Sequence, residues 1–132
     1  KAFNTVSHQH MMSGLKKRGV DEHFINLIQN MYDNTTTHIK TKDGIPTLIK
    51  ILKGVKQGDP LSPLLFNLAL DPLLCRLEKK GKGFQHEMFT ITAMAFAEDL
   101  VLLSNSWEGM AHKITILETF CDLTGLKTQG EK

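Results

Sequence analysis

Residues 91–103 place two adjacent acids, Glu98 and Asp99, inside an otherwise apolar run. Burying two neighbouring carboxylates costs several kcal/mol each unless a cation or hydrogen-bond donors compensate. Two interpretations follow from this cost. Either the run presents the pair to a metal ion, or the pair forms the tip of a hairpin where both carboxylates face water. In both cases we expect two strands, one on each side of the acids.

Two amphipathic helices are predicted ahead of that window. Asn4 and Ser7 are suitable N-cap residues for a helix that ends at Gly19, and Asp21 is suitable for the cap of a second helix. The apolar residues of the second helix recur at i, i+3, i+4 and i+7, at Phe24, Leu27, Ile28 and Met31. We therefore expect this face to pack on the core.

Residues 35–42 and 47–55 predict two strands, joined by the tight-turn dipeptide Asp43-Gly44. Threonine and lysine recur on one face of both strands, so we expect that face to meet solvent or a charged ligand. A loop rich in glycine and proline follows. Ser62 as N-cap and Pro63 at the first helical position predict that a third helix starts at its end.

The third helix is apolar on nearly every side, which predicts that it is buried. Asp71-Pro72 either kinks this helix or caps its continuation. A last helix is expected over residues 107–123, ending at Gly125. Its predicted inner face consists of Ile114, Leu117 and Cys121.

Helices and strands alternate irregularly along the chain, without repeated βαβ units. This order favours an α+β fold in which helices pack on one face of an antiparallel sheet. A chain of 132 residues is long enough for one domain with a real core. The chain starts at Lys1, without a methionine, and ends at Lys132 in mid-pattern, so we expect it to be part of a longer polypeptide.

Composition sets looser limits. The chain is 41% hydrophobic and 23% charged, as in ordinary globular proteins, and its net charge of +2 permits nucleic-acid binding without demanding it. Cys75 and Cys121 lie in apolar helical patterns, which predicts buried free thiols in a reducing compartment. His8 and His10 have no further ligands nearby in the sequence, so we expect them on a helix surface. Neither a membrane span nor a signal peptide is visible, so no membrane partner is expected.

Three segments together resemble successive motifs of reverse transcriptases. They are KAFNTVSH at residues 1–8, GVKQGDPLSP at 54–63 and AFAED at 95–99, and GLKTQGEK at 125–132 resembles the motif that follows. The match is to the non-LTR retrotransposon branch that includes the site-specific elements. It covers the whole chain in order, and QGDPLSP is its most specific part.

The resemblance implies a right-hand polymerase palm with part of the fingers over residues 1–132, and RNA-directed DNA polymerisation. Two Mg²⁺ ions would assist attack of a primer 3′-hydroxyl on a nucleotide, and magnesium prefers carboxylate oxygens. By this resemblance Glu98 and Asp99 are catalytic metal ligands, and Lys132 protonates the pyrophosphate leaving group. The family's other metal-binding aspartate lies upstream of Phe3, before Lys1, so the first palm strand is expected to be missing.

The resemblance also implies nucleotide-binding roles for Phe3, Gln57, Gly58 and Asn67. Phe3 resembles an aromatic gate against the sugar, although a core residue is the alternative. Gln57 and Gly58 resemble a loop that contacts the nucleotide and its template base, although a plain connector into the helix would also explain them. Asn67 lies one helical turn before Asp71 and would line the same site, whereas capping at Pro72 explains Asp71 equally well.

The expected partners are an RNA template, a DNA primer and a deoxynucleoside triphosphate, inside the cell in the cytoplasm or nucleus. Candidate phosphate contacts are Lys40, Lys42, Lys50 and Lys53, with a solvated lysine face as the alternative. Glu98 stands where the family has aspartate, and its extra methylene predicts slowed or lost catalysis. The isolated chain is expected to be inactive. The alternatives are a decayed or domesticated module that binds nucleic acid or protein without catalysis, and an unrelated α+β domain.

Overall fold

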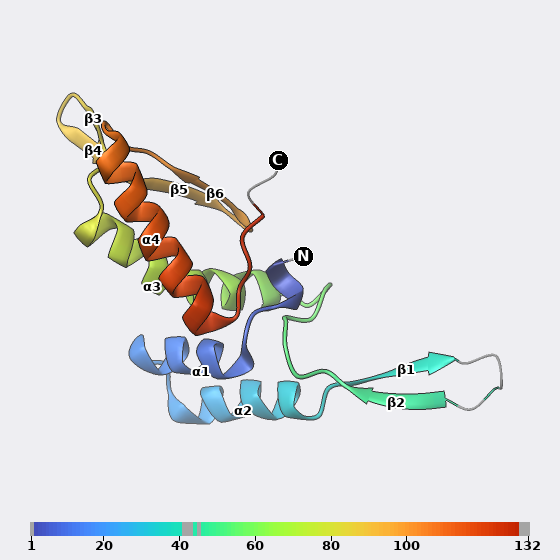
Figure 1. Cartoon of the computed structure of the whole chain (residues 1–132). Coiled ribbons are helices and arrows are strands. Elements are labelled where there is room, and N and C mark those ends of the chain that lie inside the picture. The colour runs from blue at the N-terminus through green and yellow to red at the C-terminus, as the bar shows by residue number, and fades with distance from the viewer. Residues whose placement is uncertain (1, 41–43, 45, 130–132) are drawn as a thin grey trace.

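The computed structural model describes residues 2–40, 44 and 46–129, and these form a mixed α+β arrangement (Figure 1). Its helices are a 3-10 turn η1 (Ala2–Asn4), α1 (His8–Lys17), α2 (Glu22–Asp33), α3 (Ser62–Lys80) and α4 (Trp107–Thr124). Its strands are β1 (Thr36–Lys40), β2 (Pro46–Lys50), β3 (Phe84–His86), β4 (Phe89–Ile91), β5 (Ala93–Phe96) and β6 (Asp99–Leu102). The α+β class is therefore as predicted.

The strands of the described residues form three separate antiparallel hairpins, β1–β2, β3–β4 and β5–β6. The single antiparallel sheet that we expected is not formed among these residues. Each strand pairs with its neighbour in sequence, and the helix α3 separates the first hairpin from the other two along the chain. The hairpin β3–β4 was missing from the sequence prediction, because three-residue strands leave almost no alternation to detect.

The first two helices begin at their predicted caps. The Ser7 side chain accepts a hydrogen bond from the His10 amide, and the Asp21 side chain accepts one from the His23 amide. The buried face of α2 differs from the prediction. Of the four expected residues only Ile28 is buried, together with Ile25 and Tyr32, whereas the other three are exposed: Phe24, Leu27 and Met31.

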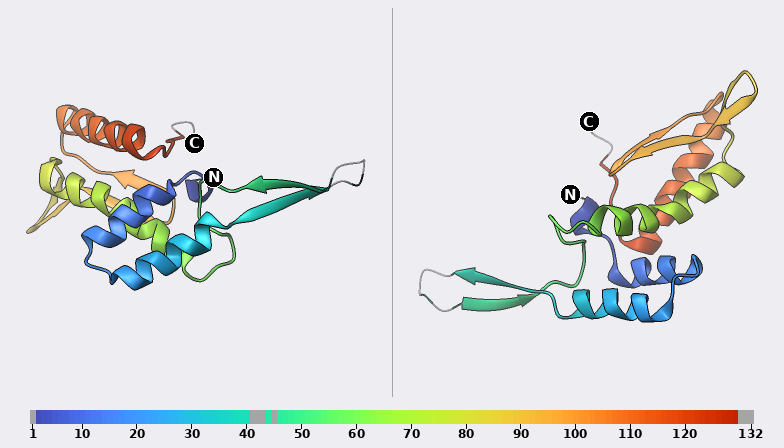
Figure 2. Two further views of the ribbon diagram at one scale, coloured as in Figure 1. Left: turned by 90° about the horizontal axis from the view of Figure 1, so that it is seen from below. Right: turned by 180° about the vertical axis from the view of Figure 1, so that it is seen from behind.

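The β1–β2 hairpin projects away from the helices (Figures 1 and 2). Strand β2 ends at Lys50, five residues before the predicted end, because the chain then leaves the hairpin and runs past the N-terminal segment. There Lys53 forms an isolated antiparallel bridge with Ser7. Thr37, Ile39, Thr47 and Ile49 share one face of the hairpin by register, so both threonine and apolar side chains face solvent there. Asp43 of the predicted turn lies outside the described residues.

Helix α3 joins the two halves of the core. Its N-terminal half packs with α1 and α2 around Phe66 and Ala69, and its C-terminal half packs with α4 and the β5–β6 hairpin around Leu73 and Leu77. The helix continues through Pro72. Two details differ from the prediction. Leu64 is 59% exposed, so the helix is not buried on every side. The Ser62 hydroxyl donates to the Lys56 carbonyl instead of capping the helix.

Helix α1 approaches α3 beside Pro72. Proline has no N–H, so it leaves the Leu68 carbonyl without its usual helical donor. Gly14 of α1 faces that carbonyl, and a Cβ at this glycine would stand 3.4 Å from the Leu68 oxygen. One turn further on, Arg18 forms an ion pair with Asp71. The hydrogen bond from Arg18 lowers the pKa of the Asp71 carboxyl.

Helix α4 ends as predicted, at Gly125 in the left-handed conformation (φ 74°). Its inner face is different from the expected one. Ile114 is exposed and Leu117 and Cys121 are half-buried, while Lys113 and Ile116 are buried. Burial raises the pKa of the Cys121 thiol, as expected for an unreactive structural cysteine.

Candidate functional site

Backbone hydrogen bonds join the N-terminal segment to the Gly- and Pro-rich loop. The Val55 amide donates to the Phe3 carbonyl over 2.8 Å, and the Gly54 amide donates to the Val6 carbonyl over 2.8 Å. Gly54 has φ 89°, and a Cβ there would stand 2.7 Å from the Asn4 Cα. Only glycine allows this approach. Residues 2–6 and 54–57, about fifty positions apart in sequence, thus form one unit.

His8 reinforces this unit and His10 ties α1 to α3, contrary to the expectation that both lie on a helix surface. The His8 Nε2 lies 2.8 Å from the Gly54 carbonyl, and its ring lies 4.8 Å from that of Tyr32. The His10 Nε2 lies 2.8 Å from the Ala69 carbonyl on α3. Both histidines are half-buried structural contacts. Their spacing at the start of a helix carries no signal of these distant carbonyl partners.

Phe3 stacks on Phe66 of α3, with ring centroids 4.3 Å apart and an interplanar angle of 16°. Phe66 is 1% exposed, whereas Phe3 is half-buried. The stack anchors the N-terminal segment on the core and fits the core-packing interpretation of Phe3. The ring retains partial exposure, so its role as a gate stays a prediction.

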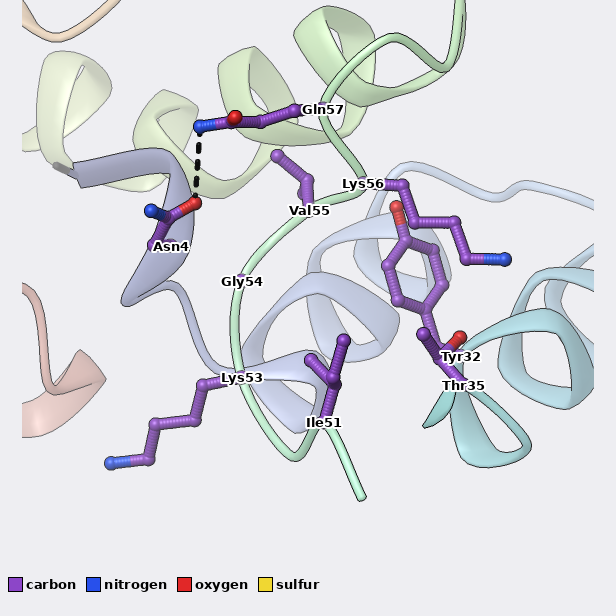
Figure 3. Close-up of a pocket in the computed structure, with 9 residues that line it drawn as sticks. All are labelled: Asn4, Tyr32, Thr35, Ile51, Lys53, Gly54, Val55, Lys56 and Gln57. Carbon is purple, nitrogen blue, oxygen red and sulfur yellow. Dashed lines mark hydrogen bonds between the residues drawn. The ribbon is translucent and has the colours of Figure 1, made fainter. Parts of the chain in front are cut away.

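Gln57 lies at the rim of an open groove of about 530 Å³ (Figure 3). The groove is lined by Asn4, Tyr32, Thr35, Ile51, Lys53, Gly54, Val55, Lys56 and Gln57. The Gln57 amide donates to the Asn4 side-chain oxygen over 3.4 Å, which couples the predicted nucleotide loop to the N-terminal segment. The lining includes two lysines and no acid, so the groove favours an anionic ligand.

The other three predicted nucleotide-binding residues, Phe3, Gly58 and Asn67, are not part of this lining. Gly58 adopts φ 88° with open space around it, so its left-handed backbone turns the loop without a packing contact. Asn67 is exposed on α3, and Asp71 is held by Arg18. Hydrogen bonds between the N-terminal segment and the loop therefore bring Phe3 and Gln57 into one unit, whereas Asn67 lies apart from the groove.

The acid pair occupies the tip of the β5–β6 hairpin. Ala97, with φ 50°, and Glu98 form the turn, and Asp99 opens β6 opposite Phe96. Both acids are exposed, so the hairpin-tip interpretation describes where they lie. Met94, Phe96, Asp99 and Val101 share one face of the hairpin by register, and on it Phe96 is 84% exposed. The opposite face packs on α3 and α4 through Ala93, Leu100 and Leu102.

The donor chemistry of the tip suits a hard cation, because Glu98 and Asp99 offer only oxygen ligands. Within the described part of the chain, however, no group of three or more histidines, cysteines, aspartates or glutamates is arranged to hold a metal ion. The tip therefore fits two ligands of a Mg²⁺ site rather than a whole one. Lys132 and Lys42 lie outside the described residues, whereas Lys50 and Lys53 are exposed.

Helix α3 carries both parts of the candidate site. Its first turns follow directly on the Gln57 loop, and Phe66 holds Phe3 there. Along its length, the acid-bearing tip and η1 both lie toward its N-terminal end (Figures 1 and 2). No helix in the described ranges is long and apolar enough to cross a membrane.

Comparison with known proteins gives one consistent family. The model of the reverse transcriptase (RNA-dependent DNA polymerase) family matches residues 1–132. The Pol polyprotein of the type-1 retrotransposable element R2 from Popillia japonica is 40% identical over the whole chain, and its counterpart from Nasonia vitripennis is 36% identical over 98% of it. The type-2 element R2DM polyprotein of Drosophila melanogaster is 34% identical over the whole chain. The chain spans 19%, 12% and 12% of the lengths of these three relatives.

Proposed function

Because the chain belongs to the reverse transcriptase family and matches the R2 group of non-LTR retrotransposons, we propose that it supplies the palm and part of the fingers of an RNA-directed DNA polymerase. In this proposal residues 1–132 act together as one partial reverse transcriptase domain. One observation supports this proposal most strongly. The segment with Phe3 is hydrogen-bonded to the loop with Gln57, and α3, which follows this loop, also packs against the hairpin that carries the two acids.

The proposed reaction is attack of a primer 3′-hydroxyl on the α-phosphorus of a deoxynucleoside triphosphate, with release of pyrophosphate. When bound, Mg²⁺ would supply Lewis-acid stabilisation of the attacking and leaving oxygens. Asp99 and Glu98 would hold it through carboxylate oxygens, and the exposure of the tip leaves them accessible. Lys132 would donate the proton that leaves with the pyrophosphate.

The remaining residues would position the nucleotide and the strands. The exposed part of Phe3 would pack against the sugar, and Gln57, Gly58 and Asn67 would contact the nucleotide and its template base. Lys53 is an exposed cation in the groove lining and Lys50 is an exposed cation at the end of β2. Both would contact strand phosphates without reading sequence. We place this activity inside the cell, in the cytoplasm or nucleus.

A second candidate is a module that binds nucleic acid or protein and no longer catalyses. Glu98 favours it, because the longer side chain moves a metal ligand by about 1 Å, whereas catalytic groups tolerate about 0.5 Å. A primer-extension assay of the full-length polypeptide that carries this domain separates the two candidates. Extension is measured with an RNA template and, as a control, without it. Template-dependent extension that rises about tenfold or more in Glu98→Asp supports the polymerase.

Glu87→Asp is the matched control, because Glu87 is another exposed glutamate, in the β3–β4 turn, outside the proposed site. This variant should extend the primer as the wild type does. Retained primer–template binding with no extension by either the wild type or Glu98→Asp would refute the polymerase proposal and support the binding module.

A further inference from the structure

Lys113 of α4 is the one charged residue that is buried in the described part of the chain, and its exposed fraction is 0%. Its ammonium donates hydrogen bonds to two backbone carbonyls, that of Thr92 over 2.7 Å and that of Leu103. Burial lowers the pKa of this lysine. A buried amine paired with backbone carbonyls is unusual, because an apolar residue would fill the same space without a desolvation cost.

The two carbonyls mark the open end of the β5–β6 hairpin. Thr92 directly precedes β5 and Leu103 directly follows β6, and the Leu103 amide also donates to the Thr92 carbonyl over 3.0 Å. Lys113 therefore ties together both strands of the hairpin at its base and fastens that base to α4. At the other end of the same two strands lies the turn with Glu98 and Asp99.

The hairpin packs on the helices through one of its two faces. It is two-stranded within the described structure, and such hairpins are marginal in isolation. Its outer face, with Met94 and Phe96, is exposed, so only the inner face is held by packing. A fixed base therefore has a direct effect on the orientation of the tip, because four residues per strand separate them.

The chain leaves room for the lysine stem at Gly81, the residue that follows α3. A Cβ at Gly81 would stand 2.8 Å from the Lys113 Cε and 2.5 Å from the Leu77 carbonyl oxygen. The absence of a side chain at this position is therefore what allows the Lys113 side chain to pass from α4 to the base of the hairpin.

We propose that Lys113 is a positioning residue: by clamping the Thr92 and Leu103 carbonyls it fixes the direction in which the β5–β6 hairpin presents Glu98 and Asp99. The catalytic consequence rests on the polymerase function proposed above, whereas the clamping itself does not. Lys113 does not touch the reacting atoms. Its loss should therefore slow the chemical step and leave nucleotide affinity nearly unchanged.

The test compares Lys113→Met with Lys79→Met in the full-length polypeptide. Methionine keeps the volume of the stem and removes its hydrogen bonds, and Lys79 is an exposed helical lysine that controls for charge. Amide hydrogen exchange by mass spectrometry should show residues 92–103 of Lys113→Met exchanging about tenfold faster, with α1 and α2 unchanged. In primer extension its kcat should fall about tenfold while the KM for the nucleotide stays within about twofold. Lys79→Met should match the wild type in both assays.

Unchanged exchange of the hairpin in Lys113→Met overturns the proposal, as does a loosened hairpin with unchanged kcat. If the amides of Lys113→Met exchange faster throughout the protein, the variant Lys113→Gln, which keeps a neutral hydrogen-bond donor, is measured as well. Faster exchange confined to the hairpin in Lys113→Gln supports the clamp, and faster exchange throughout overturns it. If neither the wild type nor Glu98→Asp extends primers, the polymerase proposal is refuted instead, and the exchange data then decide the clamp alone.

Discussion

Replacing Gly54 by alanine perturbs the joint between the N-terminal segment and the Gln57 loop. The new Cβ would stand 2.7 Å from the Asn4 Cα and 2.9 Å from both its carbonyl carbon and oxygen. These are backbone atoms, so no flexible side chain can move aside. The Gly54 amide and carbonyl hold Val6 and His8 over 2.8 Å each, which restrains the loop from retreating.

Two terms set the magnitude. Holding an alanine at φ 89° costs about 1–3 kcal/mol, and relieving an overlap inside packed structure costs about 1–3 kcal/mol more. We therefore expect Gly54→Ala to lower the free energy of unfolding by about 2–6 kcal/mol. That is a large share of the roughly 5–15 kcal/mol of a typical domain.

Gly58→Ala is the matched control for this experiment. Gly58 has almost the same φ, 88°, in the same loop, but nothing lies within 4 Å of a Cβ built there. Urea unfolding of the purified chain, followed by circular dichroism, should show a loss in Gly58→Ala of only about 1–3 kcal/mol from the backbone strain. Equal losses in the two variants would refute the argument that Gly54 is required by its contact with Asn4.

Two further predictions concern α3. Phe66→Ala should lower the free energy of unfolding by about 3–5 kcal/mol, because it removes a buried ring on which Phe3 stacks. Leu64→Ala, at an exposed site, should lower it much less, and urea unfolding measures both. The Arg18 hydrogen bond lowers the pKa of the Asp71 carboxyl in the folded protein, so the ion pair stabilises the fold. This stabilisation is present above the ordinary carboxyl pKa of about 4, and it is lost as the pH falls through the lower pKa of the folded protein. The difference in unfolding free energy between wild type and Asp71→Asn should therefore be largest above about pH 5 and shrink at lower pH, and a pH-independent difference would contradict this assignment.

Local signals predicted where elements begin and end. Ser7 and Asp21 cap their helices, Gly125 ends the last one, and the acid pair lies at the tip of a hairpin of two strands. These features depend on a few neighbouring residues and their backbone preferences, so they can be predicted without knowledge of the fold.

Which apolar face is buried was not predictable in the same way. Helix α2 carries two apolar stripes, and the choice of Ile25 and Tyr32 over Phe24 depends on where α1 lies. Lys113 was missed because an isolated lysine in a helix normally faces solvent, and only the fold places two carbonyls within its reach.

For the candidate site, too, local features were predictable from the sequence and their spatial arrangement was not. The Gln57 loop and the Glu98–Asp99 turn were recognisable from their own residues. Their relation was not, since it depends on the Phe3–Phe66 stack, the Gly54 contact and the course of α3.

The most direct test of the proposed polymerase is the rate of single-nucleotide addition to a primer on an RNA template by the full-length polypeptide and its Asp99→Asn variant. The proposal predicts that the substitution lowers this rate by a factor of about 100 or more, because it removes a charged metal ligand, while primer–template binding in a filter assay stays unchanged. Nucleotide addition by Asp99→Asn at the wild-type rate would show that the hairpin tip is not the catalytic centre.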